Sequence, residues 1–161
     1  MIQNQEIRER EIKIVAKNRK AFHDFFIVST IEVGIVLQGT EVKSLRQSKC
    51  SLQDSYAGFI EPDNNDLYVI NMHIAPYEQG NINNHEPKRK RKLLVKQREA
   101  VKLRTAVQEK GFTLIPLSVY FSGRFVKVEI GLVRSKKKYD KREDTKKKDA
   151  EREIRRKLRD Y

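Results

Sequence analysis

A strongly basic segment near the C-terminus limits what this chain can fold into. Residues 136–148, KKKYDKREDTKKK, carry eight Lys or Arg side chains, three acidic side chains and one aromatic ring. No packed core can contain such a segment, because burying an unpaired charge is strongly unfavourable. We therefore expect one folded domain at residues 14–133, a loose N-terminus at residues 1–13 and a basic tail at residues 134–161.

The charge distribution favours nucleic acid as the partner. The chain has a formal net charge of +13 over 161 residues, and residues 134–161 hold 14 Lys or Arg against seven Asp or Glu. Clustered positive charge is typical of proteins that bind polyanions. A membrane surface is the weaker alternative, since no apolar run approaches the roughly 18 residues of a spanning helix. With no secretory signal and a single cysteine, Cys50, we expect a cytoplasmic protein.

Residues 14–133 predict a mainly β domain with short helices. Alternating apolar residues and clusters of turn formers indicate about six strands. The strands are expected at residues 25–29, 31–37, 55–60, 67–72, 113–121 and 125–133. Small antiparallel sheets of this kind close into a barrel to remove exposed edges, so we predict an oligonucleotide-binding (OB) type of barrel. Pro116 predicts a bulge or an edge in its strand.

Two helices and one long loop complete the predicted domain. A short helix begins with Thr40 as its N-cap, and a longer one runs from about Lys96 to Lys110, with Gly111 after its end. Residues 76–92 lack apolar periodicity, contain two prolines and end in five consecutive basic residues, KRKRK. Loops as long as this one are commonly functional.

Several polar residues are candidates for RNA contact, each with a plainer alternative. In the basic loop we favour phosphate contact over simple solvation for Lys88, Arg89, Lys90 and Arg91. Lys43 and Arg46, on the short helix, fit both interpretations equally. Glu32 points to the opposite face of its strand from Ile31 and Val33 and could accept hydrogen bonds from a base. On the pattern alone, an ordinary exposed glutamate is the simpler interpretation.

The sequence offers no catalytic pattern. The histidines at positions 23, 73 and 85 belong to no zinc-binding spacing, and no glycine-rich phosphate loop or G-x-S-x-G motif is present. His23 and Asp24 are adjacent, and adjacent residues of a strand point to opposite faces. We expect Cys50 to be a buried or half-buried thiol. The chain is therefore expected neither to be an enzyme nor to need a metal or cofactor.

The tail is predicted to be disordered when free. Its charged composition cannot support a core of its own. However, Ala150, Ile154 and Leu158 recur at intervals of four residues, and Glu151 and Arg155 lie one helical turn apart. We expect the tail to become helical against a partner, and a solubilising tail without structure is the alternative.

Several blocks of sequence follow one another along most of the chain. They are NRKAFHDF (18–25), GIVLQGTEVKSLR (34–46), the hairpin from Ser51, HIAPY (73–77), NNHEPKRKRKLL (83–94), G-x-T-x-x-P-L-x-x-Y (111–120) and KKKYDKR (136–142). Together they resemble the small protein B family, whose members bind transfer-messenger RNA (tmRNA) in bacterial trans-translation. The resemblance runs from about Ile14 to the end of the chain.

The resemblance implies a mechanism based on positioning. In this family an OB-like barrel binds the tRNA-like domain of tmRNA and stands where the anticodon arm of a tRNA would be. The complex enters ribosomes whose mRNA has run out. The basic tail then becomes helical in the vacant mRNA path and so senses the empty channel, and the stalled peptide receives a degradation tag. The implied partners are tmRNA and the ribosome, especially the small-subunit decoding centre and mRNA path, with a monomeric protein and no membrane.

The resemblance also assigns residues to these contacts. The implied tmRNA contacts are Glu32, Leu93, Leu94 and Lys96. The implied decoding-centre contacts are Lys17, Asn18 and His23. The implied channel residues are Lys136, Lys137, Lys138, Tyr139, Asp140, Lys141 and Arg142, with Ile154 and Leu158 as an apolar stripe.

Three positions depart from the family pattern. Val33 stands where the family usually has Ala, between Glu32 and Gly34. Lys96 stands where the family commonly has Asn or His, and a lysine cannot accept a hydrogen bond. Ser135 stands where the family has glycine, and this change stiffens the link between barrel and tail. The competing hypothesis is a general OB-type RNA chaperone with a nonspecific basic tail.

Overall fold

The computed structural model describes residues 10–159, apart from the side chains of Asn81, Lys138 and Tyr139. The helices are α1 (Arg19–Asp24), α2 (Gly39–Arg46), α3 (Gln97–Lys110), α4 (Lys138–Arg159) and a 3-10 turn, η1 (Asn81–Asn83). The strands are β1 (Ile12–Lys17), β2 (Phe25–Ile35), β3 (Cys50–Ser51), β4 (Tyr56–Phe59), β5 (Leu67–Ile70), β6 (His73–Ile74), β7 (Arg91–Leu94), β8 (Thr113–Ser122) and β9 (Phe125–Ser135). Most of the expected loose terminus and the last two tail residues lie outside the described residues.

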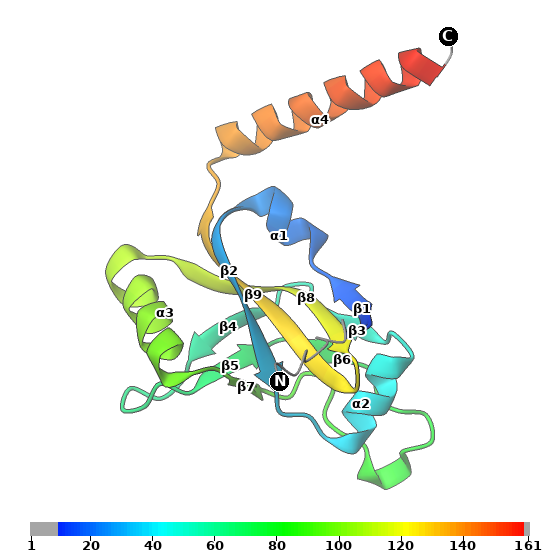
Figure 1. The fold of residues 1–161 in the computed structure, drawn as a ribbon, viewed down its shortest axis with the longest axis vertical. Coiled ribbons are helices and arrows are strands. Elements are labelled where there is room, and N and C mark those ends of the chain that lie inside the picture. The colour runs from blue at the N-terminus through cyan, green and yellow to red at the C-terminus, as the bar shows by residue number, and fades with distance from the viewer. Residues whose placement is uncertain (1–9, 160–161) are drawn as a thin grey trace, which may run out of the picture.

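Six strands close into a ring, as the sequence predicts (Figure 1). Their order is β8-β4-β5-β7-β2-β9, and β9 pairs again with β8 to complete the circle. All these pairs are antiparallel. β1 pairs with β8 but is not part of the ring, and β3 pairs with β6 in a small separate sheet. Closing the ring gives hydrogen-bond partners to the backbone N–H and C=O groups that the edge strands of an open sheet would leave unpaired.

The core fills the ring with the inward residues of each strand. Its most deeply buried members include Val33, Val69, Val119, Val128 and Ile130. Each buried side chain of this size contributes roughly 1.5–3 kcal/mol. A second, smaller cluster lies under α1 and contains Ala21, Ile115, Leu117 and Val133.

Both predicted hairpins are confirmed. The strands β4 and β5 pair across the turn at residues 60–66, and β8 and β9 pair across Gly123, whose φ is +60°. The register of β8 with β9 shifts between Pro116 and Ser118, which confirms the predicted bulge. The helix α3 runs over Gln97–Lys110 and is followed by Gly111 in the left-handed conformation, which confirms the predicted range and end.

Four local predictions are wrong. The expected strands at 25–29 and 31–37 are one strand, β2, with a bulge at Val28. The expected loop at 76–92 ends at Lys90, because β7 begins at Arg91. The N-cap of α2 is Gln38 rather than Thr40, since the Gln38 backbone N–H donates to Glu41 Oε1 at 2.9 Å. The strand β1 and the helix α1 were not predicted, and β1 begins inside the expected loose terminus.

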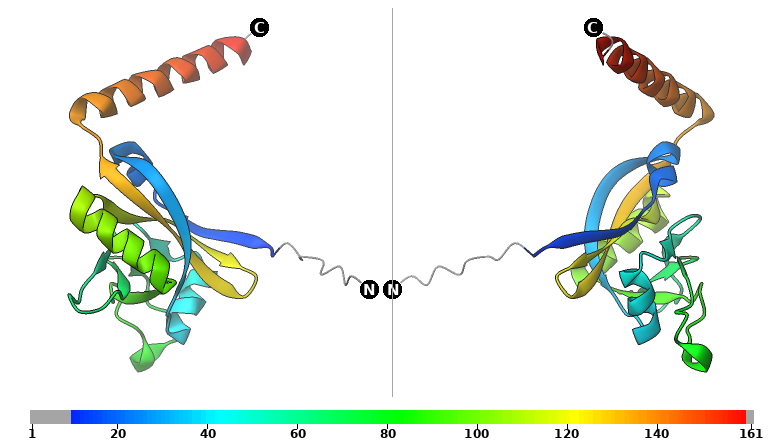
Figure 2. Two further views of the ribbon diagram at one scale, coloured as in Figure 1. Left: turned by 60° about the vertical axis from the view of Figure 1, so that its left-hand side comes forward. Right: turned by 90° about the vertical axis from the view of Figure 1, so that its right-hand side faces the viewer.

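In the structure the tail is a helix, α4, over Lys138–Arg159, and the expectation that it is disordered when free stays a prediction. The helix α4 projects away from the barrel and meets it only beside α1 (Figure 2). Ile154 and Leu158 are 58% and 72% exposed, so no core supports the outer turns. Lys, Arg and Glu are good helix formers, and Asp140 in the first turn with Arg159 in the last suits the helix dipole.

Within residues 10–159, no helix is long and apolar enough to cross a membrane.

Candidate RNA interface

The outer face of the ring brings Glu32 and Leu94 close together. Gly34, two residues after Glu32, pairs directly with Leu94 of β7. A Cβ atom at Gly34 would lie 3.2 Å from Leu94 Cβ, so glycine makes room for the leucine side chain. Leu94 is 57% exposed, whereas Leu93 points into the core. The implied contact of Leu93 with tmRNA is therefore wrong, because its side chain is not accessible.

Glu32 has acidic and hydroxyl neighbours that sequence reasoning missed. It lies directly opposite Glu129 of β9. The Tyr120 hydroxyl donates a hydrogen bond to Glu32 Oε2, and the Ser118 hydroxyl donates to Glu129 Oε2 at 3.1 Å. Burial first, and then the hydrogen bond and negative charge of Glu32, raise the pKa of Tyr120. The alternation of residues 126–130 was the signal that could have placed Glu129 on this outer face.

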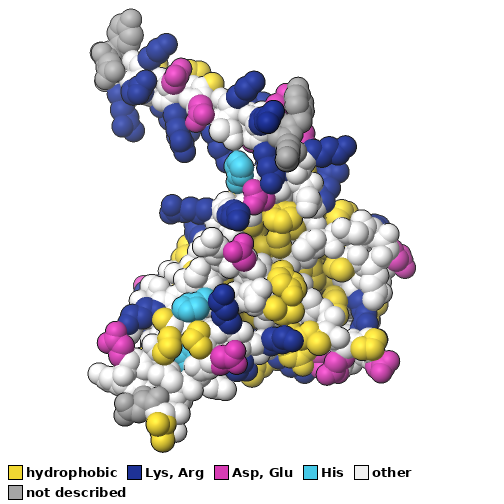
Figure 3. Space-filling view, turned by 180° about the vertical axis from the view of Figure 1, so that it is seen from behind, with side chains coloured by type: hydrophobic (Ala, Val, Ile, Leu, Met, Phe, Trp, Pro, Cys, Tyr) yellow, Lys and Arg dark blue, Asp and Glu magenta, His cyan; other side chains and the backbone are white. Residues whose placement is uncertain are grey.

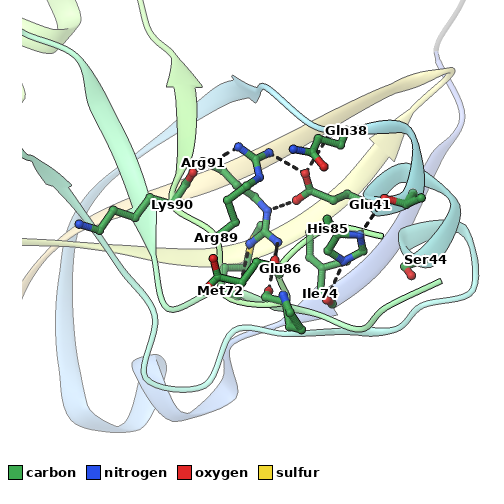
Figure 4. A network of polar contacts seen from close by, with 12 residues as sticks. Gln38, Glu41, Ser44, Met72, Ile74, His85, Glu86, Arg89, Lys90 and Arg91 are labelled. Atoms are coloured by element: carbon green, nitrogen blue, oxygen red, sulfur yellow. Dashed lines mark hydrogen bonds and ion pairs between the residues drawn. The ribbon is translucent and has the colours of Figure 1, made fainter. Parts of the chain in front are cut away.

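The basic loop does not act as one unit, because its side chains alternate between solvent and interior. Lys88 and Lys90 are exposed. Arg89 Nη2 lies 2.6 Å from Glu41 Oε1, and Arg91 is fully buried. Arg91 bonds to Glu41 Oε2 and donates to the Met72 carbonyl at 2.7 Å (Figure 4). The predicted phosphate contact of Arg91 is therefore wrong, since its guanidinium is enclosed by the protein.

The Glu41 network fixes α2 to the barrel. Burial alone would raise the pKa of Glu41, but hydrogen bonds from Arg89, the Gln38 backbone and Arg91 hold it below its ordinary value. His85 lies on the other side of α2, with Nε2 donating to the Ile74 carbonyl at 2.9 Å and Nδ1 lying 2.9 Å from Thr40 Oγ1. His85 is thus a structural residue that connects α2 to β6.

The exposed cations around this network remain available to an anion. Lys43 and Arg46 lie on the solvent side of α2, and Lys43 Nζ lies 5.3 Å from the centre of the Tyr77 ring. Lys96 is exposed at the start of α3, where the free backbone N–H groups also favour negative charge.

The three implied decoding-centre residues differ in how exposed their side chains are. Lys17 is exposed and lines a hollow of about 600 Å³. Asn18 is 8% exposed, accepts from the Ala21 N–H at 3.1 Å and donates to the Pro116 carbonyl at 3.1 Å. The implied rRNA contact of Asn18 is therefore wrong in this structure, because its amide caps α1 and ties it to β8.

His23 lies on α1 and faces the tail. Its Nδ1 lies 3.0 Å from Asp24 Oδ1, and its Nε2 lies 3.4 Å from Thr145 Oγ1 of α4. The expectation that His23 and Asp24 point apart is wrong because they belong to a helix and not to a strand. The ring is exposed apart from these contacts, so it remains accessible to a partner.

The first tail residues connect α4 to α1. The Lys136 backbone N–H donates to the Asp24 carbonyl at 2.9 Å, and Lys136 Nζ pairs with Asp144. Lys141 Nζ lies 3.3 Å from Asp24 Oδ1. Lys137 and Arg142 are exposed and Asp140 is half-buried. The side chains of Lys138 and Tyr139 lie outside the described residues.

Cys50 is half-buried, as expected, and burial raises its pKa to about 11. Among the described residues, no three His, Cys, Asp or Glu side chains are placed to hold a metal ion.

A protein-family model described as "SmpB protein" matches residues 15–160, which include both the ring and α4. The chain belongs to the SmpB protein family. The resemblance inferred from the sequence blocks is thereby confirmed.

Individual relatives agree with membership of the SmpB family. An SsrA-binding protein of Carboxydothermus hydrogenoformans is 54% identical over 91% of this chain and 97% of its own length. An SsrA-binding protein of Acetivibrio thermocellus is 55% identical over 94% of this chain and 97% of its own length. A solved structure described as "tmRNA-SmpB: a journey to the center of the bacterial ribosome" matches with a TM-score of 0.64 and 48% identity. That match covers 76% of this chain and 85% of the solved one.

The tail of this SmpB-family chain carries 14 Lys or Arg against seven Asp or Glu, and the rest of the chain is also net positive. Figure 3 shows Lys and Arg side chains distributed along α4, while apolar side chains gather on the barrel below it. The acidic pair of Glu32 and Glu129 lies on the barrel, outside the basic tail. A carboxylate on a barrel of a basic protein suits a base edge better than a phosphate.

Proposed function

We propose that this chain is an RNA-binding factor of trans-translation. It binds the tRNA-like domain of tmRNA, delivers tmRNA to stalled ribosomes and senses the empty mRNA channel with its tail, which enables tagging and ribosome rescue. The observation that carries the proposal is membership of the SmpB family across both ring and tail. The names of the relatives and the tmRNA complex among the similar structures support it.

The proposed tmRNA surface combines two kinds of contact. Glu32 accepts hydrogen bonds from a base, and Leu94 beside it packs against the same nucleotide region. Phosphates are bound by the exposed cations around this face, which are Lys43, Arg46, Lys88, Lys90 and Lys96, with partial access to Arg89. The carboxylate supplies selectivity, while the cations supply affinity through counterion release.

The proposed role of α4 is to occupy the vacant mRNA path. Its 22 residues make a rod of about 33 Å with positive charge on many sides. The charge favours entry into a channel walled by rRNA, and the exposed Ile154 and Leu158 gain contacts inside it. A helix formed beforehand loses less conformational entropy on entry than a disordered segment would.

The protein acts by positioning and carries out no reaction. We propose that it works as a monomer in the cytoplasm, where ribosomes translate, and uses no cofactor. Lys17 and His23 approach the decoding centre, because both are exposed and His23 lies 3.4 Å from Thr145 at the base of the tail.

Removing the tail tests the division of labour. A chain that ends at Arg134 should bind tmRNA with nearly unchanged affinity but fail to support tagging on stalled ribosomes in a reconstituted translation assay. Equal loss of both activities would contradict separate roles for barrel and tail.

Salt titration separates selectivity from phosphate contact. Glu32→Ala should weaken binding to tmRNA without changing the slope of log K against log salt, whereas Lys88→Ala with Lys90→Ala should flatten that slope by about one unit for each lost contact. A general RNA chaperone would bind other structured RNAs as tightly as tmRNA at moderate salt. That result would replace the proposed function.

A further inference from the structure

The contact between Tyr120 and Glu32 joins two distant parts of the chain on the outer face of the ring. Tyr120 lies on β8 and Glu32 on β2, with β9 between them. The register places Tyr120 opposite Lys127 and Glu32 opposite Glu129, so the phenol reaches diagonally across β9 to the carboxylate. The contact lies outside the core, at an exposed glutamate that the hydrophobic packing does not need.

Glu32 needs such a partner to keep a defined position. Like charges directly opposite one another in a sheet are destabilising, and Glu129 repels the Glu32 carboxylate toward solvent. An exposed glutamate otherwise samples several rotamers, and fixing one of them lowers binding affinity. The hydroxyls of Tyr120 and Ser118 each satisfy one carboxylate oxygen of the pair. The other oxygen of each carboxylate still has acceptor capacity.

We propose that Tyr120 is a positioning residue that holds the Glu32 carboxylate ready for a nucleobase. The proposal rests on the proposed function, in which Glu32 contacts tmRNA. Tyr120 holds Oε2, and Oε1 is the acceptor for an exocyclic amine or ring N–H of the base. The entropic cost of ordering Glu32 is thus met on folding of the protein and not on binding.

The chemistry of the phenol supports this role. Because the pKa of Tyr120 is raised by burial and by Glu32, the hydroxyl keeps its proton and remains a donor at any pH at which the ribosome works. A phenylalanine would fill the same volume and remove only the donor. Comparing Tyr120→Phe with Glu32→Ala therefore measures the effect of this one hydrogen bond.

The test is a double-mutant cycle on binding of the full chain to a fluorescent RNA of the tmRNA tRNA-like domain. Tyr120→Phe should weaken binding roughly tenfold, as expected for a hydrogen bond to a charged group. Tyr120→Phe in a Glu32→Ala background should have no further effect, and the salt slope should stay that of the wild type. Tyr56→Phe, which removes the hydroxyl of an exposed tyrosine on β4, is the matched control and should bind normally.

Each other outcome identifies what failed. If Glu32→Ala weakens binding but Tyr120→Phe does not, or if the two effects multiply, the positioning role is overturned while the proposed function stands. If Glu32→Ala binds normally, the proposed contact at Glu32 is itself wrong. A ¹³C-tyrosine titration checks the contact without RNA: Glu32→Gln should lower the pH at which Tyr120 ionises, and an unchanged titration would overturn the proposal.

Discussion

The guanidinium of Arg91 is paired inside the protein with Glu41, and both side chains are fully buried. Removing one partner of a buried pair leaves an uncompensated charge, which destabilises a protein by about 3–5 kcal/mol. We predict that Glu41→Gln lowers the free energy of unfolding by about this amount in urea denaturation. The exposed pair of Glu78 with Lys49 is the control, and Glu78→Gln should change stability by less than about 1 kcal/mol. Similar losses in both variants would contradict a structural role for Arg91.

The same pair gives the protein a defined acid sensitivity. The pKa of Glu41 is lower in the folded protein than its ordinary value of about 4.3. The ionised carboxylate therefore contributes its full stabilisation of the fold at pH values above about 4.3. This contribution is lost as the pH falls through the lower folded pKa. Between pH 6 and pH 2, unfolding free energies measured in urea should therefore fall more for the wild type than for Glu41→Gln. An equal fall in the two proteins would show that Glu41 is not responsible.

Single residues were predictable where their neighbours in sequence decide their direction. Ile31 and Val33 place Glu32 on the outer face, and the structure agrees. Arg91 was not predictable, because KRKRK is uniform in charge and carries no apolar alternation. Its direction depends on the pairing of β7 with β5 and on a carboxylate 50 residues earlier in the chain.

Among the elements, β9 carries a glycine that the packing of its neighbours requires. A Cβ atom at Gly131 would lie 2.8 Å from Cδ1 and 3.1 Å from Cγ of Leu117, which is buried in the cluster under α1. Leu117 cannot move without disturbing that cluster, so Gly131→Ala should cost about 1–3 kcal/mol of unfolding free energy. At Gly58 on β4 the nearest atom would be 4.0 Å away, so Gly58→Ala should be neutral or stabilising by up to about 1 kcal/mol. Thermal and urea unfolding of the two variants measure whether each substitution lowers or raises the free energy of unfolding.

Elements with local signals were predicted, and those that depend on distant partners were not. The two hairpins and α3 follow from turn residues, alternation and Gly111. The helix α1 has six residues and is fixed by Asn18, which bonds to the Pro116 carbonyl 98 residues away. The strand β1 was not predicted from the sequence, because its pairing with β8 leaves most of its side chains exposed and its sequence therefore lacks a clear apolar pattern.

At the scale of the whole molecule, the direction of the tail depends on a few polar contacts between α1 and α4. Asp24 contacts both His23 and Lys141, and Asp144 pairs with Lys136. The hydrogen bond from His23 holds the pKa of Asp24 low, and that from Lys136 does the same for Asp144. Both carboxylates are therefore ionised at any pH above the ordinary pKa of an aspartate, which is about 3.9. Their contacts are lost at lower pH, as the pH falls through the lowered pKa values of the folded protein.

We predict that these contacts set the orientation of α4 but not its helicity. Asp24→Asn with Asp144→Asn should broaden the distance distribution between spin labels on α3 and on the outer part of α4, while the circular dichroism of the chain changes little. The wild type should show the same broadening as the pH falls through the lowered pKa values of the two carboxylates. Asp149→Asn, which alters an exposed carboxylate 3.9 Å from Arg152 farther along α4, is the control and should leave the distribution unchanged. A broad wild-type distribution at pH 7, equal to that of the double variant, would show that the tail is not held by α1. The helix would then take up its direction only in the ribosomal channel.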